Sequence, residues 1–516
     1  MMGIQFRNDA SLEGQVLLYL GEDISSSKKG EDTWRLRYGE LEGIPIESWP
    51  EEAKTYAQKD AEYSYKVFFK QLERVTKLPN RPLILSNAAF QTMASFCLNF
   101  CSSAIGVKIS ERVHTLKKET LKKFQTMAEQ SPFYKVSKKS KTGYSCNKTQ
   151  IGSHIRKICP NYKKTKTGKV ATSSEAIEFA QKHLNMRDKS LDAYLEAEDV
   201  RSTYSKYLTK LEEGLSSHRR RKRYSYSLGK TGRGLSTVFN NLPREGEIRS
   251  LIVPEEGRTF LFGDYSNAEM RSLAHITHLR DYPEQKLWER YSKDPYFDPH
   301  TLVACGLYNG NKGLTPIEYE EGLKIIKDES HTLHKTLKNL RRLAKVLNFG
   351  LAGGLGSGSL VGYAKNNYGV ELSRREAEIR IREWKRILPE MNFYFYDAQV
   401  PRGTNGKMII TPVTGRCMWA RGFTQACNYP FQSISSDGAK DAFISIFKEC
   451  FINRESVLYG SLPIIFLHDE IVLEIKRGNE QQKGKLFEEI MCRSMEKYTG
   501  EIKAILEWEI ADQWTK

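Results

Sequence analysis

The chain has 516 residues and a mass of 59.3 kDa, which is enough for about three domains or for one large fold with a smaller element. Its 80 Lys and Arg residues outnumber its 63 Asp and Glu residues, which gives a formal net charge of +17. No run approaches the roughly 20 apolar residues that cross a bilayer, and the composition excludes a collagen, a coiled coil and a disulfide scaffold. The charge excess favours a polyanionic partner such as nucleic acid, although solubility alone also explains it.

The cysteines and the first residues bear on the location of the protein. None of the nine cysteines forms a CxxC pair, and the first residues lack the basic and apolar regions of a secretory signal. We therefore expect a reducing compartment, the cytoplasm of a bacterial or virus-infected cell, and no membrane partner.

Residues 1–80 are interpreted as the end of a larger domain. Between residues 51 and 74 the sequence has helical spacing, with Tyr56, Tyr63, Val67 and Phe68 as the apolar positions. The same helix carries Tyr56 and Asp60, which are either ordinary surface residues or the remains of a functional site.

Residues 81–235 are expected to be helical and basic. Lysine pairs and one longer basic run lie at 117–118, 122–123, 138–139, 163–164 and 218–223. Each cluster is either a set of phosphate contacts along a duplex or a solvated surface, and the longer run also fits the weak pattern of a nuclear signal.

Two apolar runs in the C-terminal half end in aspartate. Residues 258–266 predict a buried strand from which Asp264 emerges, and residues 462–475 predict two strands joined by a tight turn that holds Asp469. Either aspartate alone is explained as a turn or capping residue. Two carboxylates beside a core need a positive partner, and a pair of Mg²⁺ ions roughly 4 Å apart is the natural match.

Residues 331–349 contain no Gly or Pro and predict a helix that ends at Gly350. Arg341, Lys345 and Phe349 follow one another at four-residue intervals, so they share one face of this helix. An arginine, a lysine and an aromatic residue on one face can bind a triphosphate and stack on a base. Without other evidence, however, this segment favours an ordinary surface helix with charged side chains. The Gly-rich segment that follows has no GKS or GKT and is interpreted as a hinge.

In this order the three elements resemble the motifs of family A DNA polymerases, the group of bacterial DNA polymerase I and many phage enzymes. The resembling motifs are DYSNAEMR at 264–271, the spaced Arg341, Lys345 and Phe349, and the triplet HDE at 468–470. Three further parts of the sequence resemble motifs of this family. They are TGR at 231–233, Asp298 with His300, and Asn428 with Gln432. The likeness covers roughly residues 80–516.

The resemblance implies an α/β (α+β) right-hand polymerase fold, with a helical thumb and helical fingers around a palm built on an antiparallel sheet. The implied parts are the remnant of a 3′–5′ exonuclease domain at 1–80, the thumb and the start of the palm at 81–235, the palm at 236–290 and 401–516, and the fingers at 291–400.

The resemblance also implies a role for each matching residue. Asp264 and Asp469 would hold the metal ions, assisted by the carbonyl of Tyr265, and Glu470 would support them. Glu269 would exclude a ribose 2′-hydroxyl. The other implied dNTP-binding residues are His300, Arg341, Lys345 and Phe349, and the implied primer- and template-binding residues are Arg233, Asn428, Gln432 and His468.

The implied function is template-directed DNA synthesis, in which two Mg²⁺ ions per site assist the attack of a primer 3′-hydroxyl on a dNTP. The expected partners are primer–template DNA, dNTPs, and either a separate 3′–5′ exonuclease polypeptide or a processivity factor. One alternative is a single-subunit RNA polymerase, against which Glu269 argues. Others are a catalytically inactive DNA-binding relative, against which the intact Asp264 and Asp469 argue, and a two-metal nuclease, which has no use for the triphosphate-binding helix.

The sequence departs from the family pattern in two places. Gly353 stands where the family usually has a tyrosine and Ala268 where it has an isoleucine, so we expect a looser pocket for the nascent base pair. Tyr56 and Asp60 resemble the last motif of the family's exonuclease, but the partner acids of that motif have no candidates upstream. We therefore expect a truncated remnant without proofreading in this chain.

Overall fold

The computed structural model describes residues 11–514, with gaps at 26–32, 42–43, 76–80, 161, 163–169, 184–187, 217–219, 241, 244–245 and 311–313. The basic positions 163–164 and 218–219 therefore lie outside the described residues. Among the described helices, none combines the length and the apolar character that crossing a membrane requires.

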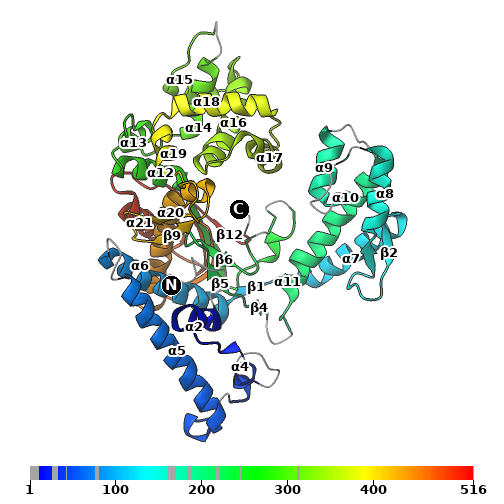
Figure 1. Ribbon diagram of the computed structural model, residues 1–516, viewed down its shortest axis with the longest axis vertical. Helices are drawn as coiled ribbons and strands as arrows, with labels where there is room; N and C mark the ends of the chain where they lie inside the picture. The colour runs from blue at the N-terminus through cyan, green and yellow to red at the C-terminus, as the bar shows by residue number, and fades with distance from the viewer. Residues whose placement is uncertain are drawn as a thin grey trace.

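A four-stranded antiparallel sheet in the order β10-β11-β7-β12 forms the middle of the molecule (Figure 1). Its strands are β7 (Arg258–Tyr265), β10 (Leu462–Leu467), β11 (Glu470–Lys476) and β12 (Leu506–Ala511). β7 and β11 are buried along nearly their whole length, as continuous apolar runs predict. The expected strand at 258–266 and the expected pair of strands at 462–475 are confirmed.

Three helices complete the hydrophobic core of this sheet, and we call the sheet and these helices the sheet layer. They are α6 (Arg81–Phe100), α20 (Phe423–Phe451) and α21 (Glu480–Thr499). The core joins Phe260 and Val472 of the strands with Leu98 of α6 and Phe443 of α20, all at most 2% exposed. Residues 81–100, which we expected at the start of the thumb segment, therefore pack with the sheet.

A second hydrophobic core holds the upper group of helices, at the top of Figure 1. These are α12 (Ala268–Leu279), α13 (Lys286–Lys293), α14 (Pro299–Asn309), α15 (Tyr319–Lys327), α16 (His334–Ala352), α17 (Ser357–Tyr368), α18 (Arg374–Ile387) and α19 (Glu390–Asp397). Their starts are fixed by local signals: Ser373 and Glu376 form a capping box at α18, and Asp298 caps α14 ahead of a proline.

A third core holds the lateral group of helices, to the right in Figure 1. It comprises α7 (Arg112–Gln130), the hairpin β2 (Tyr134–Val136) and β3 (Tyr144–Cys146), α8 (Lys148–Ile158), α9 (Ser174–His183) and α10 (Lys189–Ser202). A π-helical turn, η4 (Thr203–Leu208), and α11 (Thr209–Glu212) continue α10 back toward the sheet layer.

The N-terminal helices form a small unit at the bottom of Figure 1. α2 (Leu12–Leu20) packs on α5 (Glu51–Val75) through Val16 and Val67, and α4 (Trp34–Arg37) adds to them. The predicted helix at 51–74 is confirmed. Of the four apolar positions, Val67 is buried, whereas the Phe68 side chain is 55% exposed, because α2 covers the face of α5 that carries Val67.

Short antiparallel pairs complete the fold. They are β1 (Val107–Lys108) with β4 (Arg221–Lys222), β5 (Tyr226–Leu228) with β6 (Gly234–Ser236), and β8 (Lys407–Ile410) with β9 (Cys417–Ala420). β6 lies against β10, since a Cβ at Gly234 would come within 2.8 Å of the Phe466 ring. The expected combination of helices with an antiparallel sheet is confirmed.

Candidate functional site

The two predicted aspartates lie at the same end of the sheet. Gly263 of β7 pairs with Ile471 of β11, so the next residue of β7, Asp264, lies beside the β10–β11 turn that carries Asp469. Adjacent strands are roughly 4.8 Å apart, so the sheet makes neighbours of two residues that are far apart in the sequence.

The Asp264 carboxylate affects the pKa of Asp469. Loss of hydration and the nearby Asp264 carboxylate raise the pKa of Asp469 to about 7, while the Arg233 guanidinium opposes the rise. A like charge shifts a pKa in this way only at short range. The fold therefore brings two carboxylates together at one end of the sheet.

The turn between β10 and β11 sets the direction of these side chains. His468 adopts a left-handed backbone with φ of 60°, which is uncommon for residues other than glycine and allows the tight reversal. The next strand begins at Glu470, which is buried and accepts a hydrogen bond from Trp514 Nε1 at 2.7 Å. Trp514 thus anchors the residue that follows Asp469.

The donors present at this end of the sheet fit magnesium. Two carboxylates and the backbone of Tyr265 come together there, and the Tyr265 hydroxyl is held away in the core, where it donates to the Met491 carbonyl at 2.6 Å. No group of three or more His, Cys, Asp or Glu side chains that could hold a metal occurs within the described ranges. Mg²⁺ needs few protein ligands, because it keeps several of its waters, and a divalent cation relieves the repulsion between Asp264 and Asp469.

Arg233 and Glu269, which we expected to have separate roles, form an ion pair. Both side chains are partly exposed, at 31% and 21%. Arg233 also lies close enough to Asp469 to lower the pKa of that carboxyl. The guanidinium thus links the acidic end of the sheet to the first turn of α12.

The structure confirms the helix that carries Arg341 and Lys345, but its predicted bounds are wrong. α16 begins at His334 and passes through Gly350 to end at Ala352. Gly350 does not stop the helix because it serves close packing: a Cβ there would approach Tyr363 at 3.1 Å and Leu355 at 3.2 Å. Gly353, the residue after Ala352, caps the helix instead.

Asp298 positions the arginine of this helix. Its Oδ2 accepts a hydrogen bond from Arg341 Nε at 2.7 Å and one from the Thr301 hydroxyl at 2.5 Å, and its Oδ1 accepts from the His300 backbone N–H at 3.0 Å. Although burial opposes it, these bonds hold the pKa of Asp298 below its ordinary value. The sequence drew attention to Asp298 as part of a motif but did not indicate its bond to Arg341.

His300 is held as a neutral hydrogen-bond donor. Trp384 Nε1 donates to Asn348 Oδ1 at 2.7 Å, which leaves the Asn348 amide nitrogen to donate to His300 Nδ1 at 2.9 Å. Nε2 therefore carries the proton, and it has no hydrogen-bond partner within the described residues. Burial, with the charges of Lys345 and Arg341, lowers the pKa of His300 to about 4.

Lys345 and Phe349 complete this face of α16. The His300 and Phe349 rings lie 5.3 Å apart between centroids. Lys345 is half-buried and forms no ion pair within the described part of the chain. The structure therefore gathers a histidine donor, a guanidinium and an ammonium beside one aromatic ring, and this set is suited to a polyphosphate attached to a planar base.

Asn428 and Gln432 lie together at the end of α16. Asn428 Nδ2 donates to the Gly353 carbonyl at 3.0 Å, and Gln432 Nε2 donates to Asn428 Oδ1 at 3.1 Å. A Cβ at Gly353 would lie 2.8 Å from Asn428 Oδ1. The departure at Gly353 thus has a structural reason, because the Asn428 amide occupies the space that a side chain would need. Ala268, the other departure, is buried at 3% exposure.

Tyr56 and Asp60 lie outside this site. Both are on α5, which packs against α2, α4 and α6 and does not reach the acidic end of the sheet. Sequence analysis did not identify three residues that hold the site residues in place, namely Asn348, Trp384 and Trp514. Each acts through a contact with a residue distant in the sequence, which no local pattern shows.

Comparison with known proteins gives one consistent result. A sequence model described as DNA polymerase family A matches residues 110–316 and 324–516. The chain is 26% identical over 361 residues to DNA polymerase I of Aquifex aeolicus, covering 70% of this chain and 56% of that protein. It is 27% identical over 349 residues to DNA polymerase I of Bacillus caldotenax, covering 64% of this chain and 35% of that protein. These matches thus cover between about a third and just over half of the length of the relatives.

A solved structure has the same fold. The chain superposes on the POL domain of Pol1 from M. smegmatis, in complex with DNA primer-template and dNTP, with a TM-score of 0.64. The superposition covers 98% of this chain and 79% of the other at 18% sequence identity.

Proposed function

The chain belongs to DNA polymerase family A, and we propose on this premise that it catalyses template-directed DNA synthesis by adding dNTPs to a primer 3′-hydroxyl. The observation that carries the proposal is the pair of carboxylates, Asp264 and Asp469, at one end of the sheet. Primer-template DNA and dNTP, which are named as the ligands of the solved M. smegmatis domain, are the proposed substrates.

Asp264 and Asp469 would hold two Mg²⁺ ions, with the Tyr265 carbonyl as a further ligand. The bound ions would supply activation of the 3′-hydroxyl and stabilisation of the leaving pyrophosphate. Asp469 must be ionised to bind a cation, so its raised pKa makes metal affinity fall as the pH drops below about 7. Glu470 supports the site by fixing the turn through Trp514.

The face of α16 would bind the dNTP. Lys345 supplies a point charge, and the proton on His300 Nε2 supplies a hydrogen bond to a phosphate oxygen. Arg341 is held through its Nε by Asp298, which would leave its two Nη groups to donate to the triphosphate. Phe349 would stack near the incoming sugar and base.

The ion pair between Arg233 and Glu269 would open when substrates bind. Glu269 would then close the space beside the sugar and exclude a ribose 2′-hydroxyl. Arg233 would turn to the minor groove of the primer duplex, together with Asn428 and Gln432, and His468 would hold the primer end. The sheet layer would form the palm, the upper group the fingers and the lateral group the thumb.

Primer extension with competing nucleotides tests the proposal. Purified protein is given Mg²⁺, a primer–template and equal concentrations of ribo- and deoxynucleotides, and Asp469→Asn serves as the control. We expect extension with dNTPs that depends on Mg²⁺ and is lost in the variant. Preferential incorporation of ribonucleotides would support an RNA polymerase instead, and the absence of any extension by the wild type would contradict the proposal.

A further inference from the structure

A buried cluster of charged and amide side chains lies against the turn between β5 and β6. Its members are Asp437 and Lys440 of α20, Arg416 of the β8–β9 turn, and Gln91 of α6, and we call them the buried ion cluster. Each of these side chains belongs to a residue that is at most 7% exposed. Removing charges from water costs free energy, so the presence of such a cluster calls for a physical reason.

The carboxylate of Asp437 is the centre of the buried ion cluster. Its Oδ1 accepts hydrogen bonds from Arg416 Nη2 at 2.7 Å and from Lys440 Nζ at 2.8 Å. The amide groups of Gln91 and Asn87 also donate to this carboxylate, at 2.9 Å and 3.2 Å. Although burial opposes it, the two cations lower the pKa of Asp437 to about 2. One ionised carboxylate therefore ties together α6, α20 and the β8–β9 turn.

The buried ion cluster contains more positive than negative charge. Within the described residues, Arg416 and Lys440 share Asp437 as their one ion-pair partner. Burial lowers the pKa of the Lys440 ammonium, although the attraction of Asp437 opposes the decrease. Without Lys440, Asp437 would still have one cation and two amide donors. Lys440 is therefore not required to balance the carboxylate, and its other contacts indicate a further role.

Both cations contact the turn that carries Arg233. Gly232 has a left-handed backbone with φ of 83°, and a Cβ there would lie 2.6 Å from Lys440 Nζ and 2.7 Å from Arg416 Cζ. The turn is closed by hydrogen bonds from the Gly229 N–H to the Arg233 carbonyl and from the Gly232 N–H to the Gly229 carbonyl, both at 2.8 Å. The backbone of the turn therefore rests on the two cations, one residue before Arg233.

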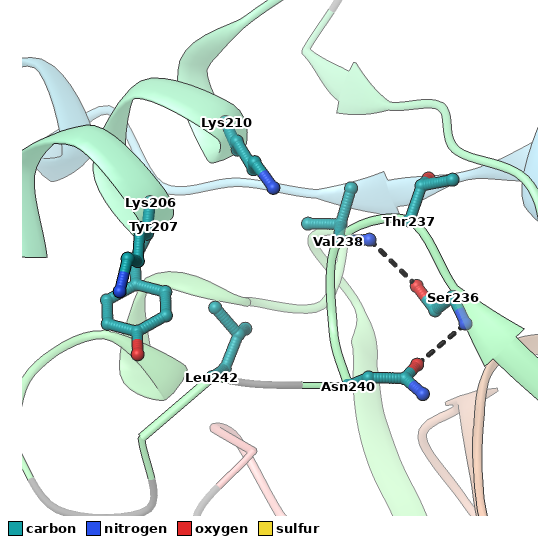
Figure 2. A pocket seen from close by; sticks show the side chains of 8 residues that line it. All are labelled: Lys206, Tyr207, Lys210, Ser236, Thr237, Val238, Asn240 and Leu242. Atoms are coloured by element: carbon teal, nitrogen blue, oxygen red, sulfur yellow. Dashed lines mark hydrogen bonds between the residues drawn. The ribbon is translucent and has the colours of Figure 1, made fainter. Parts of the chain in front are cut away.

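The strands of this hairpin are fixed by other contacts. The Tyr226 hydroxyl of β5 donates to the Phe466 carbonyl at 2.9 Å and accepts from the Phe466 N–H at 2.7 Å. At the end of β6, Asn240 accepts from the Ser236 N–H at 2.6 Å, and Ser236 Oγ accepts from the Val238 N–H at 3.1 Å (Figure 2). These bonds hold the strands, whereas the buried ion cluster supports the turn at the opposite end of the hairpin.

We propose that Arg416, Asp437 and Lys440 are positioning residues, which hold the β5–β6 turn so that the Arg233 guanidinium reaches the primer end. This inference rests on the role proposed above for Arg233 at the minor groove. The buried ion cluster would touch neither DNA nor dNTP and would act through Arg233 alone. A displacement of about 1 Å in a positioned group can cost on the order of 10²-fold in rate, so a small movement of the turn is sufficient.

A double-mutant cycle tests whether Lys440 acts through Arg233. The kcat of primer extension and the KM for dNTP are measured for the wild type, Lys440→Met, Arg233→Ala and the double variant. We expect Lys440→Met to lower kcat about tenfold, and to lower it no further in the Arg233→Ala background, because residues that act through one another are not additive. The KM for dNTP should stay unchanged, since the proposed dNTP-binding residues lie on α14 and α16.

Lys497→Met is the matched control. Lys497 donates to Asp441 at 2.7 Å, so the variant removes an exposed lysine from an ion pair with the residue that follows Lys440, and kcat should not change. Gly232→Ala tests the same contact from the side of the turn, because its Cβ would displace Lys440 Nζ while all buried charges remain. It should give the same pattern in both backgrounds, and it replaces Lys440→Met if thermal unfolding shows that this variant does not fold.

Equal losses in the two backgrounds would show a merely structural role and would overturn the proposal. Wild-type kcat in Lys440→Met and Gly232→Ala, or in Arg233→Ala, would overturn it as well. The same cycle on the affinity for a labelled primer–template separates this proposal from the proposed function. If the wild type extends no primer, the proposed function is refuted. A non-additive loss of affinity would then still support the positioning role, and additive losses would overturn it.

Discussion

The proposed role of Glu269 in sugar selection concerns a side chain that forms an ion pair with Arg233. Glu269→Ala removes the side chain that we propose closes the space beside the sugar, so we expect incorporation of ribonucleotides to rise at least about tenfold, which corresponds to about 1.4 kcal/mol. Glu269→Gln keeps the volume but loses the ion pair, so it should retain the exclusion. The ratio of kcat/KM for dNTP and rNTP measures both effects. Equal ratios in the alanine variant and the wild type would show that Glu269 has no such role.

Gly353 and Asn428 are coupled by close contact. Gly353→Ala places a Cβ 2.8 Å from Asn428 Oδ1, so the Asn428 amide has to turn away from its bond to the Gly353 carbonyl. We expect poorer discrimination against mismatched primer ends as a result, because Asn428 and Gln432 would no longer act together. Extension from matched and mismatched primers measures this change.

Gly362→Ala is the control for this substitution. Nothing lies within 4 Å of a Cβ at Gly362, and the residue is inside α17, where alanine is favourable. It should leave discrimination unchanged. The same result for Gly353→Ala would show that the contact with Asn428 has no influence on the primer end.

At the scale of elements, the start of α19 carries a buried titratable group that contacts α13. Glu390 is fully buried and accepts a hydrogen bond from the Leu287 N–H at 2.9 Å, and burial raises its pKa to about 7. Because the folded protein holds a proton that the unfolded chain loses above pH 4.5, stability falls as the pH rises from about 4.5 to 7. A shift of this size corresponds to about 3 kcal/mol.

Glu390→Gln should remove this pH dependence, since the amide oxygen still accepts from Leu287 and the side chain no longer ionises. The free energies of unfolding at pH 5 and pH 7.5 measure the effect. We expect the variant to equal the wild type at the lower pH and to be the more stable of the two at the higher pH. The same decline in both proteins would show that Glu390 does not titrate in this range.

Local patterns in the sequence predicted the elements that hold the site, but not the contacts between them. The apolar runs gave β7 and the β10–β11 turn, because burial on both faces leaves a continuous signal. The predicted bounds of α16 were wrong at both ends. The helix begins at His334 and not at residue 331, and it continues through Gly350, because a glycine is compatible with a helix where the packing requires a small residue. The bonds from Asp298 to Arg341 and from Trp514 to Glu470 depend on how distant segments pack, which spacing along one segment does not reveal.

At the scale of the whole molecule, we propose that this chain does not proofread. Tyr56 and Asp60 are on α5 in the N-terminal unit, and the sequence before them contains no DxE motif. With Mg²⁺ and no dNTP, we expect a mismatched primer 3′ end to stay intact, and Asp60→Ala to change nothing. Gel analysis of a labelled primer measures this. Excision in the wild type that disappears in Asp60→Ala would refute the proposal.

The central claim is that Asp264 and Asp469 together hold divalent metal. The most direct measurement is a titration of the protein with Mn²⁺ in the presence of primer–template and dNTP. Electron paramagnetic resonance monitors the amount of bound Mn²⁺. We predict two bound ions in the wild type, weaker binding in both Asp264→Asn and Asp469→Asn, and a loss of extension rate on the order of 10²–10³-fold or more in each variant. Mn²⁺ binding that equals the wild type in either variant would contradict the claim.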